Sequence, residues 1–314
     1  MRGDIRVTDR DWFEFLAGQP ALDEVNFWLP SDTRTPQQLV AGMPVIFKLR
    51  ERYGGWIVGW GIFVRHQRLH AWLAWDAFGT SNGAPDFAAL RERIERLRPS
   101  RDEAPPGIPD YEIGCLMLSG PVFLPRERWV RPPRDWPANV VQGKAYDLDA
   151  GEGARVWSEC LAAAAGIPSF EETVREAEAR GDRYGSPTLR RPRLGQGLFR
   201  VEVTAAYGRA CAVTQEHSLP ALEAAHIRPY GEGGAHEVTN GLLLRSDIHH
   251  LFDKGYVGVT PDYRFVVSDR LRGDFANGRS YYPLHRTTIH VPDLVADKPN
   301  RDWLAWHMGE RFRR

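Results

Sequence analysis

The chain has 314 residues, enough for two domains with separate cores, and 42% of them are hydrophobic, as in a folded globular protein. Lys plus Arg and Asp plus Glu both number 41, so no overall basic excess indicates a nucleic-acid partner, and any phosphate binding has to rely on local charge. No apolar run approaches the ~20 residues of a membrane span, and the N-terminus is too polar for a signal peptide, so we expect a cytoplasmic protein. The three cysteines form no CxxC pair, so we expect neither a disulfide framework nor a cysteine-based zinc site.

The first 150 residues contain short apolar runs separated by glycines and prolines. A helix is expected after a cap at Thr8 or Asp9, and another runs from Asp86 to about Leu97. Strands are expected at 25–31, 44–49, 56–64, 70–75 and 113–124. Short strands at this spacing, with only two helices, favour a compact β-barrel with helical additions.

The middle of the chain changes to a helical pattern. Residues 151–182 carry apolar side chains at helical intervals with charges between them, which predicts a helical linker. The next segment contains Arg190, Arg191 and Arg193 among glycines and prolines. It is either a basic approach to DNA phosphates or a solvated loop between domains.

The most informative stretch runs from Cys211 to Thr260 and reads CAVTQEHSLPALEAAHIRPYGEGGAHEVTNGLLLRSDIHHLFDKGYVGVT. Residues 221–227 predict a strand, and the loop 228–239, with one proline and three glycines, turns the chain back. A short apolar run at 242–244 follows, and Ser246 is the expected N-cap of a helix that starts near Asp247. This reversal brings three polar residues into one small space: His226, Asn240 and His249.

The end of the chain predicts further short elements. Strands are expected at 263–271 and 287–292, and a final helix at 302–312.

The stretch from Cys211 to Thr260, with His226, Asn240 and His249, resembles the HNH nucleases, whose unit is two strands and a helix around one divalent metal ion. The resemblance covers roughly the last 120 residues, because RLGQGLFR and DWLAWH also fit. It implies that His226 is the general base, a role that suits an imidazole with a pKa of about 6.5. It also implies that His249 is a metal ligand and that Asn240 pins the loop and orients the base.

One position departs from the family pattern. In many relatives an aspartate or histidine before the first histidine binds the metal, and here that residue is Ala225. Glu223 lies on the same strand face and could reach the metal in its place. His250 and Asp253 are further candidates. Mg²⁺ or Mn²⁺ suits such a set of oxygen and imidazole ligands, and Ni²⁺ and Zn²⁺ stay open.

The N-terminal region resembles the SRA-like and EVE-like modules of the PUA superfamily. The residues behind this are NFWLPS, FKL followed by GWGIF, AWDAFGTSNG, IGCLMLSGPVF and WPANVVQGKAYDL. The resemblance implies a domain that binds duplex DNA and extrudes a modified cytosine into an aromatic pocket. The candidate pocket residues are Asn26, Phe27, Trp28, Trp75 and Asp76. The aromatic ones are also plain candidates for the core, and Asn82-Gly83 is either a simple turn or a DNA-facing loop.

Together these features predict an α+β protein: a PUA/SRA-like β-barrel with helices at 1–150, a helical linker at 151–190 and a ββα-metal (HNH) nuclease domain at 191–314. The implied function is a type IV restriction endonuclease that senses 5-methylcytosine or 5-hydroxymethylcytosine in double-stranded DNA. Because one HNH unit cuts one strand, a homodimer is expected. The alternatives are an HNH nicking nuclease on unmodified DNA, with the barrel as a clamp, and a non-cleaving nucleic-acid-binding protein in which Ala225 marks a decayed site.

Overall fold

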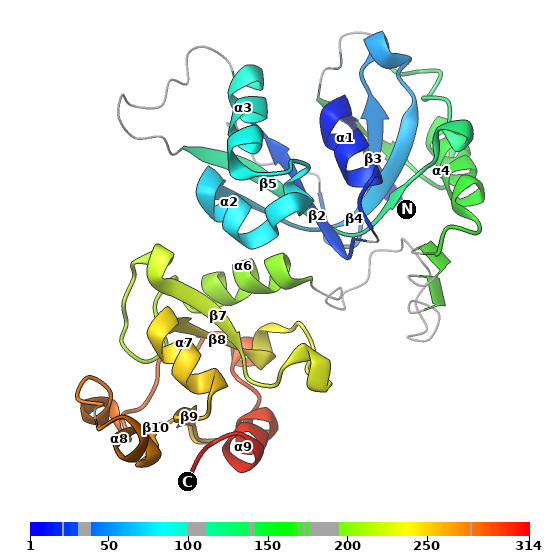
Figure 1. The fold of residues 1–314 in the computed structure, drawn as a ribbon. Helices are drawn as coiled ribbons and strands as arrows, with labels where there is room; N and C mark the ends of the chain where they lie inside the picture. The colour runs from blue at the N-terminus through cyan, green and yellow to red at the C-terminus, as the bar shows by residue number, and fades with distance from the viewer. Residues whose placement is uncertain are drawn as a thin grey trace. The chain divides into compact units, whose positions relative to one another are not determined.

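The computed structural model describes residues 1–20, 22–30, 39–98, 111–137, 140, 142–168, 170–171, 174–175, 195–276 and 278–314. The chain divides into two compact units, Met1–Arg193 and Leu194–Arg314, which Figure 1 draws. Each unit has strands and a buried core of its own. In the described parts of the chain, no helix combines the length and the apolar character that crossing a bilayer requires.

One mixed sheet frames the N-terminal unit, with its strands in the order β2-β5-β4-β3-β1-β6. β1 runs parallel to β3, and the other neighbouring pairs are antiparallel. The strands are β1 (Arg2–Thr8), β2 (Glu24–Leu29), β3 (Pro44–Leu49), β4 (Ile57–His70), β5 (Glu112–Phe123) and β6 (Gly143–Asp147).

This sheet is open, which corrects the expected closed β-barrel. β2 and β6 form its two edges, and the described residues contain no pairing between them. The ladder between β4 and β5 shifts register twice, between Trp60 and Ile62 and between Phe63 and Arg65. Such bulges bend and twist a sheet, but closure also requires the edge strands to meet.

Helices cover both faces of the sheet. Ile46 and Trp60 belong to a buried cluster with Trp157 of α4. The next residue along β3, Phe47, packs edge-on against Trp12 of α1 with ring centroids 5.2 Å apart. Successive side chains of a strand point to opposite faces, so the two aromatic clusters lie on opposite sides of the sheet. The helices of this unit are α1 (Arg10–Ala17), α2 (Ala71–Phe78), α3 (Phe87–Leu97) and α4 (Gly151–Ala164).

Figure 1 shows α2 and α3 beside the β2–β5 end of the sheet and α4 beside the opposite end. α1 and α3 lie where the sequence predicts them, and the side chains of Asp9 and Asp86 cap them by accepting backbone N–H bonds. α4 was expected as part of a linker, but it packs into the core of this unit. The basic segment with Arg190, Arg191 and Arg193 lies outside the described residues.

The expectation of a strand at residues 70–75 is wrong. β4 continues to His70, and the chain then enters α2, on which Ala71, Ala74 and Phe78 are buried. These three residues recur at helical spacing, but a short apolar run is compatible with either period. Packing against the sheet therefore decided the outcome.

The C-terminal unit is built around the antiparallel hairpin of β7 and β8, which Figure 1 shows between α6 and α7. A second hairpin pairs β9 with β10. The elements are α6 (Gln196–Ala206), β7 (Leu222–His226), β8 (Gly241–Arg245), α7 (Ser246–Asp253), β9 (Val257–Val259), β10 (Phe265–Val267), α8 (Arg270–Phe275) and α9 (Arg301–Glu310).

Three expectations for this unit are corrected. The strand expected at 263–271 is limited to β10, and Arg270 and Leu271 belong to α8. α7 begins at Ser246 itself, with Arg245 as its N-cap and no side-chain capping bond. The strand expected at 287–292 is only an isolated bridge between Arg264 and Thr288. Ile289 still donates its backbone N–H to Tyr263 O at 2.9 Å, so this stretch follows β10 without forming a regular ladder.

Candidate active site

The hairpin of β7 and β8 fixes where the candidate residues lie. Its last paired residues are His226 and Gly241, and the Ile227 N–H donates to Asn240 O at 2.9 Å just beyond them. His226 therefore ends one strand, while Asn240 precedes the next. α7 follows β8 directly, which brings His249 to the same hairpin.

Asn240 is fully buried and holds the loop between the two strands. Its Oδ1 accepts the Arg228 N–H at 2.9 Å, and its Nδ2 donates to Arg228 O and Ala235 O, both at 2.9 Å. Gly234 is required here, because a Cβ at this position would lie 1.9 Å from Arg228 O and 2.9 Å from Asn240 Nδ2. One amide thus closes the loop from both ends.

His226 is held between two rings. It stacks on Phe199 of α6, with ring centroids 3.9 Å apart and an interplanar angle of 12°. Its Nε2 lies 2.9 Å from Nδ1 of His236, whose own ring stacks on Tyr230 at 4.6 Å. His226 is thereby fixed in position and orientation.

The surroundings of His226 keep it neutral. Burial is the largest cause that lowers the pKa of His226 to about 4, and the charges of His236 and His249 contribute in the same direction. A neutral imidazole has one ring nitrogen that can accept a proton, which a protonated one lacks. The direct contacts of His226 are with His236 and Phe199.

His249 lies between two carboxylates. Its Nδ1 is 2.6 Å from Glu223 Oε2, and its Nε2 is 3.4 Å from Asp253 Oδ2. Burial raises the pKa of Asp253, and the charge of His249 opposes this shift. The contact with Glu223 joins β7 to α7 on the face of the strand that carries Ala225.

The donor set suits a divalent cation in its chemistry. Among the described residues, no three His, Cys, Asp or Glu side chains are arranged to hold a metal ion by themselves. The pair of Glu223 and His249 nevertheless offers a carboxylate and an imidazole that point at one another. A carboxylate and an imidazole bind a metal ion in their deprotonated forms, so the proton between Glu223 and His249 would leave when the metal binds. Mg²⁺ usually keeps several water ligands, so two protein ligands are sufficient. Ala225 is fully buried and adds no donor.

His250 is exposed on α7. Its ring lies parallel to that of His249, with the centroids 6.2 Å apart. This position on the helix surface separates it from the Glu223 and His249 pair.

His236 is the site residue that the sequence did not single out. It lies in the loop, ten residues after His226, without a motif that marks it. The available signal was its place between His226 and Asn240, since the loop that these two residues close must bring its own side chains to the site.

The candidate base-pocket residues do not share one surface. Asn26 and Trp28 face the turn of η2 (Gly79–Asn82): Asn26 Nδ2 donates to Asn82 Oδ1 at 2.9 Å, and Trp28 Nε1 donates to Asn82 O at 2.9 Å. Phe27 points to the other face of β2, where its ring packs against Trp12 and Phe47. The strand period therefore separates Phe27 from its two neighbours.

Trp75 and Asp76 lie on α2 rather than at a strand end. Trp75 is half-buried against Phe87, with ring centroids 6.4 Å apart, and Asp76 is exposed. Asn82 is fully buried and donates to Ala74 O and Gly79 O, so its side chain stabilises the turn.

Comparison with known proteins agrees with the geometry of the C-terminal unit. Residues 211–260, which span β7, β8, α7 and β9, match the HNH endonuclease family. Among solved structures, the chain is similar to a modification-dependent TagI restriction endonuclease, with 15% identity and a TM-score of 0.28 over 93% of this chain and 76% of that one. No curated protein matches the chain.

Proposed function

We infer that this chain, whose residues 211–260 form an HNH endonuclease unit, is a modification-dependent DNA endonuclease of the type IV restriction kind. Its substrate would be double-stranded DNA that carries 5-methylcytosine or 5-hydroxymethylcytosine. The observation that carries the nuclease role is the hairpin of β7 and β8, which ends in a neutral His226 held by Phe199 and His236 and whose Glu223 contacts His249 of α7.

His226 is the proposed general base. We assign the proton between the two imidazoles to His226 Nε2, which donates to His236 Nδ1. Nδ1 of His226 is then unprotonated and takes a proton from a water molecule. The resulting hydroxide attacks phosphorus, and the bond to the 3′ oxygen breaks. Asn240 keeps the loop, and with it His236, in place.

Glu223 and His249 are the proposed metal ligands, with Asp253 close behind His249. A bound Mg²⁺ or Mn²⁺ would stabilise the negative charge that develops on the phosphate and the leaving oxygen. Ni²⁺ and Zn²⁺ are compatible with the imidazole donor. Glu223 thus takes the role that the residue before the first histidine has in many relatives.

The N-terminal unit is the proposed sensor of the modified base. Two observations support this: it folds around its own core, separate from the nuclease unit, and α2 presents Trp75 and Asp76 at its surface. Trp75 offers a ring for stacking, and the Asp76 carboxylate can accept a hydrogen bond from a cytosine amino group. Asn26 and Trp28 would support this surface from within, through Asn82, whereas Phe27 belongs to the opposite core.

Digestion of matched plasmids tests the function. We expect the protein, with Mg²⁺ or Mn²⁺, to cut DNA that contains 5-methylcytosine or 5-hydroxymethylcytosine at least tenfold faster than unmodified DNA, because each site is bound through the flipped base. Cutting of all three plasmids at one rate would remove the sensing role and leave a nuclease for unmodified DNA. A His226→Ala variant is the control and should bind DNA without cutting it.

The form of the product tests the oligomeric state. One HNH unit cuts one strand, so double-strand breaks at single modified sites require a homodimer. Nicked circles that are linearised only slowly would instead indicate that a monomer acts on each strand separately.

A further inference from the structure

A cavity of about 540 Å³ lies on the N-terminal unit, lined by residues that the nuclease mechanism does not use. Its walls come from the turn after β3, from the loop that reads RPPR and from α4. Three of its lining residues are arginines, Arg131, Arg134 and Arg155, and one is an aromatic residue, Trp56. Phosphate-binding surfaces use this kind of composition.

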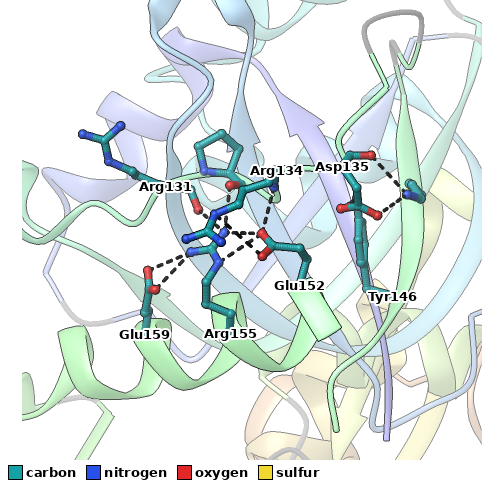
Figure 2. A network of polar contacts seen from close by, with 9 residues as sticks. Arg131, Arg134, Asp135, Tyr146, Glu152, Arg155 and Glu159 are labelled. Atoms are coloured by element: carbon teal, nitrogen blue, oxygen red, sulfur yellow. Dashed lines mark hydrogen bonds and ion pairs between the residues drawn. The ribbon is translucent and has the colours of Figure 1, made fainter. Parts of the chain in front are cut away.

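Arg155, which lines the cavity, is the centre of the network of polar contacts that Figure 2 shows. Its Nη1 bonds to both carboxylate oxygens of Glu159 at 3.0 Å, and its Nη2 bonds to Glu152 Oε2 at 2.8 Å. The same Nη2 donates to Pro132 O at 2.9 Å, while Glu152 Oε2 accepts the Arg134 N–H at 2.8 Å. Arg155 and Glu152 therefore hold the loop on α4, and Arg155 also pairs with Glu159, the acidic residue that lines the cavity.

The pair of Arg155 and Glu152 stays charged at neutral pH. Hydrogen bonds from the Arg155 side chain, the largest cause, and from the Arg134 N–H together lower the pKa of Glu152 to about 2. Pro132 and Pro133 further restrict the loop, because their rings fix the backbone angle φ and keep the residue before each proline extended. The backbone between Arg131 and Arg134 is thus pre-organised.

The other two guanidinium groups are left for a ligand. Arg131 lies over the Trp56 ring, 5.6 Å from its centroid, and no carboxylate in the described chain forms an ion pair with it. The Arg134 side chain is 83% exposed, and its Nε is 4.0 Å from Glu152 Oε1, at the limit of an ion pair. Arg131 and Arg134 lie three residues apart in the loop, so each guanidinium can contact a different phosphate of one strand.

We propose that this cavity binds the phosphate backbone of DNA, with Arg131 and Arg134 as its two contacts and Trp56 as the support that orients Arg131. The proposal rests on the proposed function for the identity of the polymer. It makes the RPPR loop a positioning contact, which holds the duplex on the N-terminal unit and reads no bases.

The salt dependence of DNA binding tests the proposal. The full-length protein, kept in chelator without divalent metal, is titrated against a labelled duplex by fluorescence anisotropy at several salt concentrations. For Arg131→Ala/Arg134→Ala we expect at least tenfold weaker binding at moderate salt, and a salt slope lower by about 2, because each lost phosphate contact removes about 0.9 from the slope. Arg131→Lys/Arg134→Lys should keep the slope.

The matched control is Arg91→Ala/Arg96→Ala on α3. It removes the same charge from the same unit, but these arginines are paired with Glu95 and Asp11. We expect its slope to stay within about 0.5 of the wild-type value. Equal slopes for wild type and Arg131→Ala/Arg134→Ala would overturn the proposal.

A free nucleotide is the other source of a phosphate group. Calorimetric titration with dCMP that shows binding to wild type but not to Arg131→Ala/Arg134→Ala, together with unchanged DNA binding, would also overturn the DNA assignment. The outcome is independent of cleavage: a wild type that binds DNA through this loop but never cuts it would refute the nuclease proposal and leave this one standing.

Discussion

At the scale of single residues, the contact between His226 and His236 is the feature on which catalysis depends in our proposal. A histidine that acts as a base must be neutral and must present the correct nitrogen to water. Burial supplies the first condition and the 2.9 Å contact with His236 supplies the second. His236 touches no reacting atom, so its role is to position the base.

Two substitutions separate this role from simple packing. His236→Phe keeps the stack on Tyr230 but removes the acceptor, and we expect kcat to fall about 10- to 100-fold with DNA affinity unchanged. His236→Asn loses the ring but places an amide oxygen near the former Nδ1, and should recover much of kcat. Cleavage rates and DNA affinities of both variants are the measurement. Equal rates for His236→Phe and wild type would show that the contact does not matter.

Glu223 is the residue that we expect to replace the ligand missing at Ala225. Because it faces His249 directly, Glu223→Gln removes an anionic donor while keeping the shape of the side chain. We expect the metal concentration for half-maximal cleavage to rise about 10- to 100-fold, and chelation to stop cleavage in both proteins. Glu216→Gln, which removes a carboxylate that caps an exposed turn, is the control. The same metal requirement in Glu223→Gln and wild type would exclude this ligand.

At the scale of elements, α9 is tied to α7 by a buried histidine. His307 stacks on Phe252 with ring centroids 3.8 Å apart, and its Nε2 donates to Phe252 O at 3.1 Å. Burial lowers the pKa of His307 to about 4, whereas its usual value is about 6.5. This histidine couples the packing of α9 to pH.

The sign of this coupling follows from proton binding. Below about pH 6.5 the unfolded chain binds a proton that the folded chain does not bind until about pH 4, so stability falls as the pH drops through this window. From pH 7 to pH 5 we expect His307 to cost roughly 2 kcal/mol of unfolding free energy. Denaturant unfolding of wild type and His307→Phe at both pH values measures it. The His307→Phe variant should lose less stability than wild type on acidification. Parallel pH profiles of the two proteins would show that His307 is not the source of the pH dependence. His226 adds a dependence of the same sign to both proteins.

At the scale of the whole molecule, the two units divide the proposed work. The nuclease unit carries the proposed base and the proposed metal ligands on one hairpin and one helix, and the N-terminal unit has an open sheet with helices on both faces. In this arrangement, removing the metal should stop cutting but leave binding to modified DNA intact, because the surfaces proposed for binding lie on the other unit.

The sequence by itself determined the order of the elements in the central part of the nuclease unit. The order strand, loop, strand and helix follows from the apolar runs and the glycines between His226 and Asn240, and residues 211–260 match the HNH endonuclease family that these motifs resemble. Several strands and the cap Asp86 were also readable from short-range spacing, whereas the choice of Asp9 over Thr8 as the other cap came from the structure.

Only the tertiary structure decided what depends on contacts between distant segments. Closure of the sheet depends on whether β2 and β6 meet, and the helical state of residues 71–78 depends on their packing against the sheet. The local spacing of apolar residues specifies neither. The partner of His226 was hidden for the same reason: His236 reaches it because Asn240 folds the intervening loop back, a contact encoded by the whole hairpin and by no single motif.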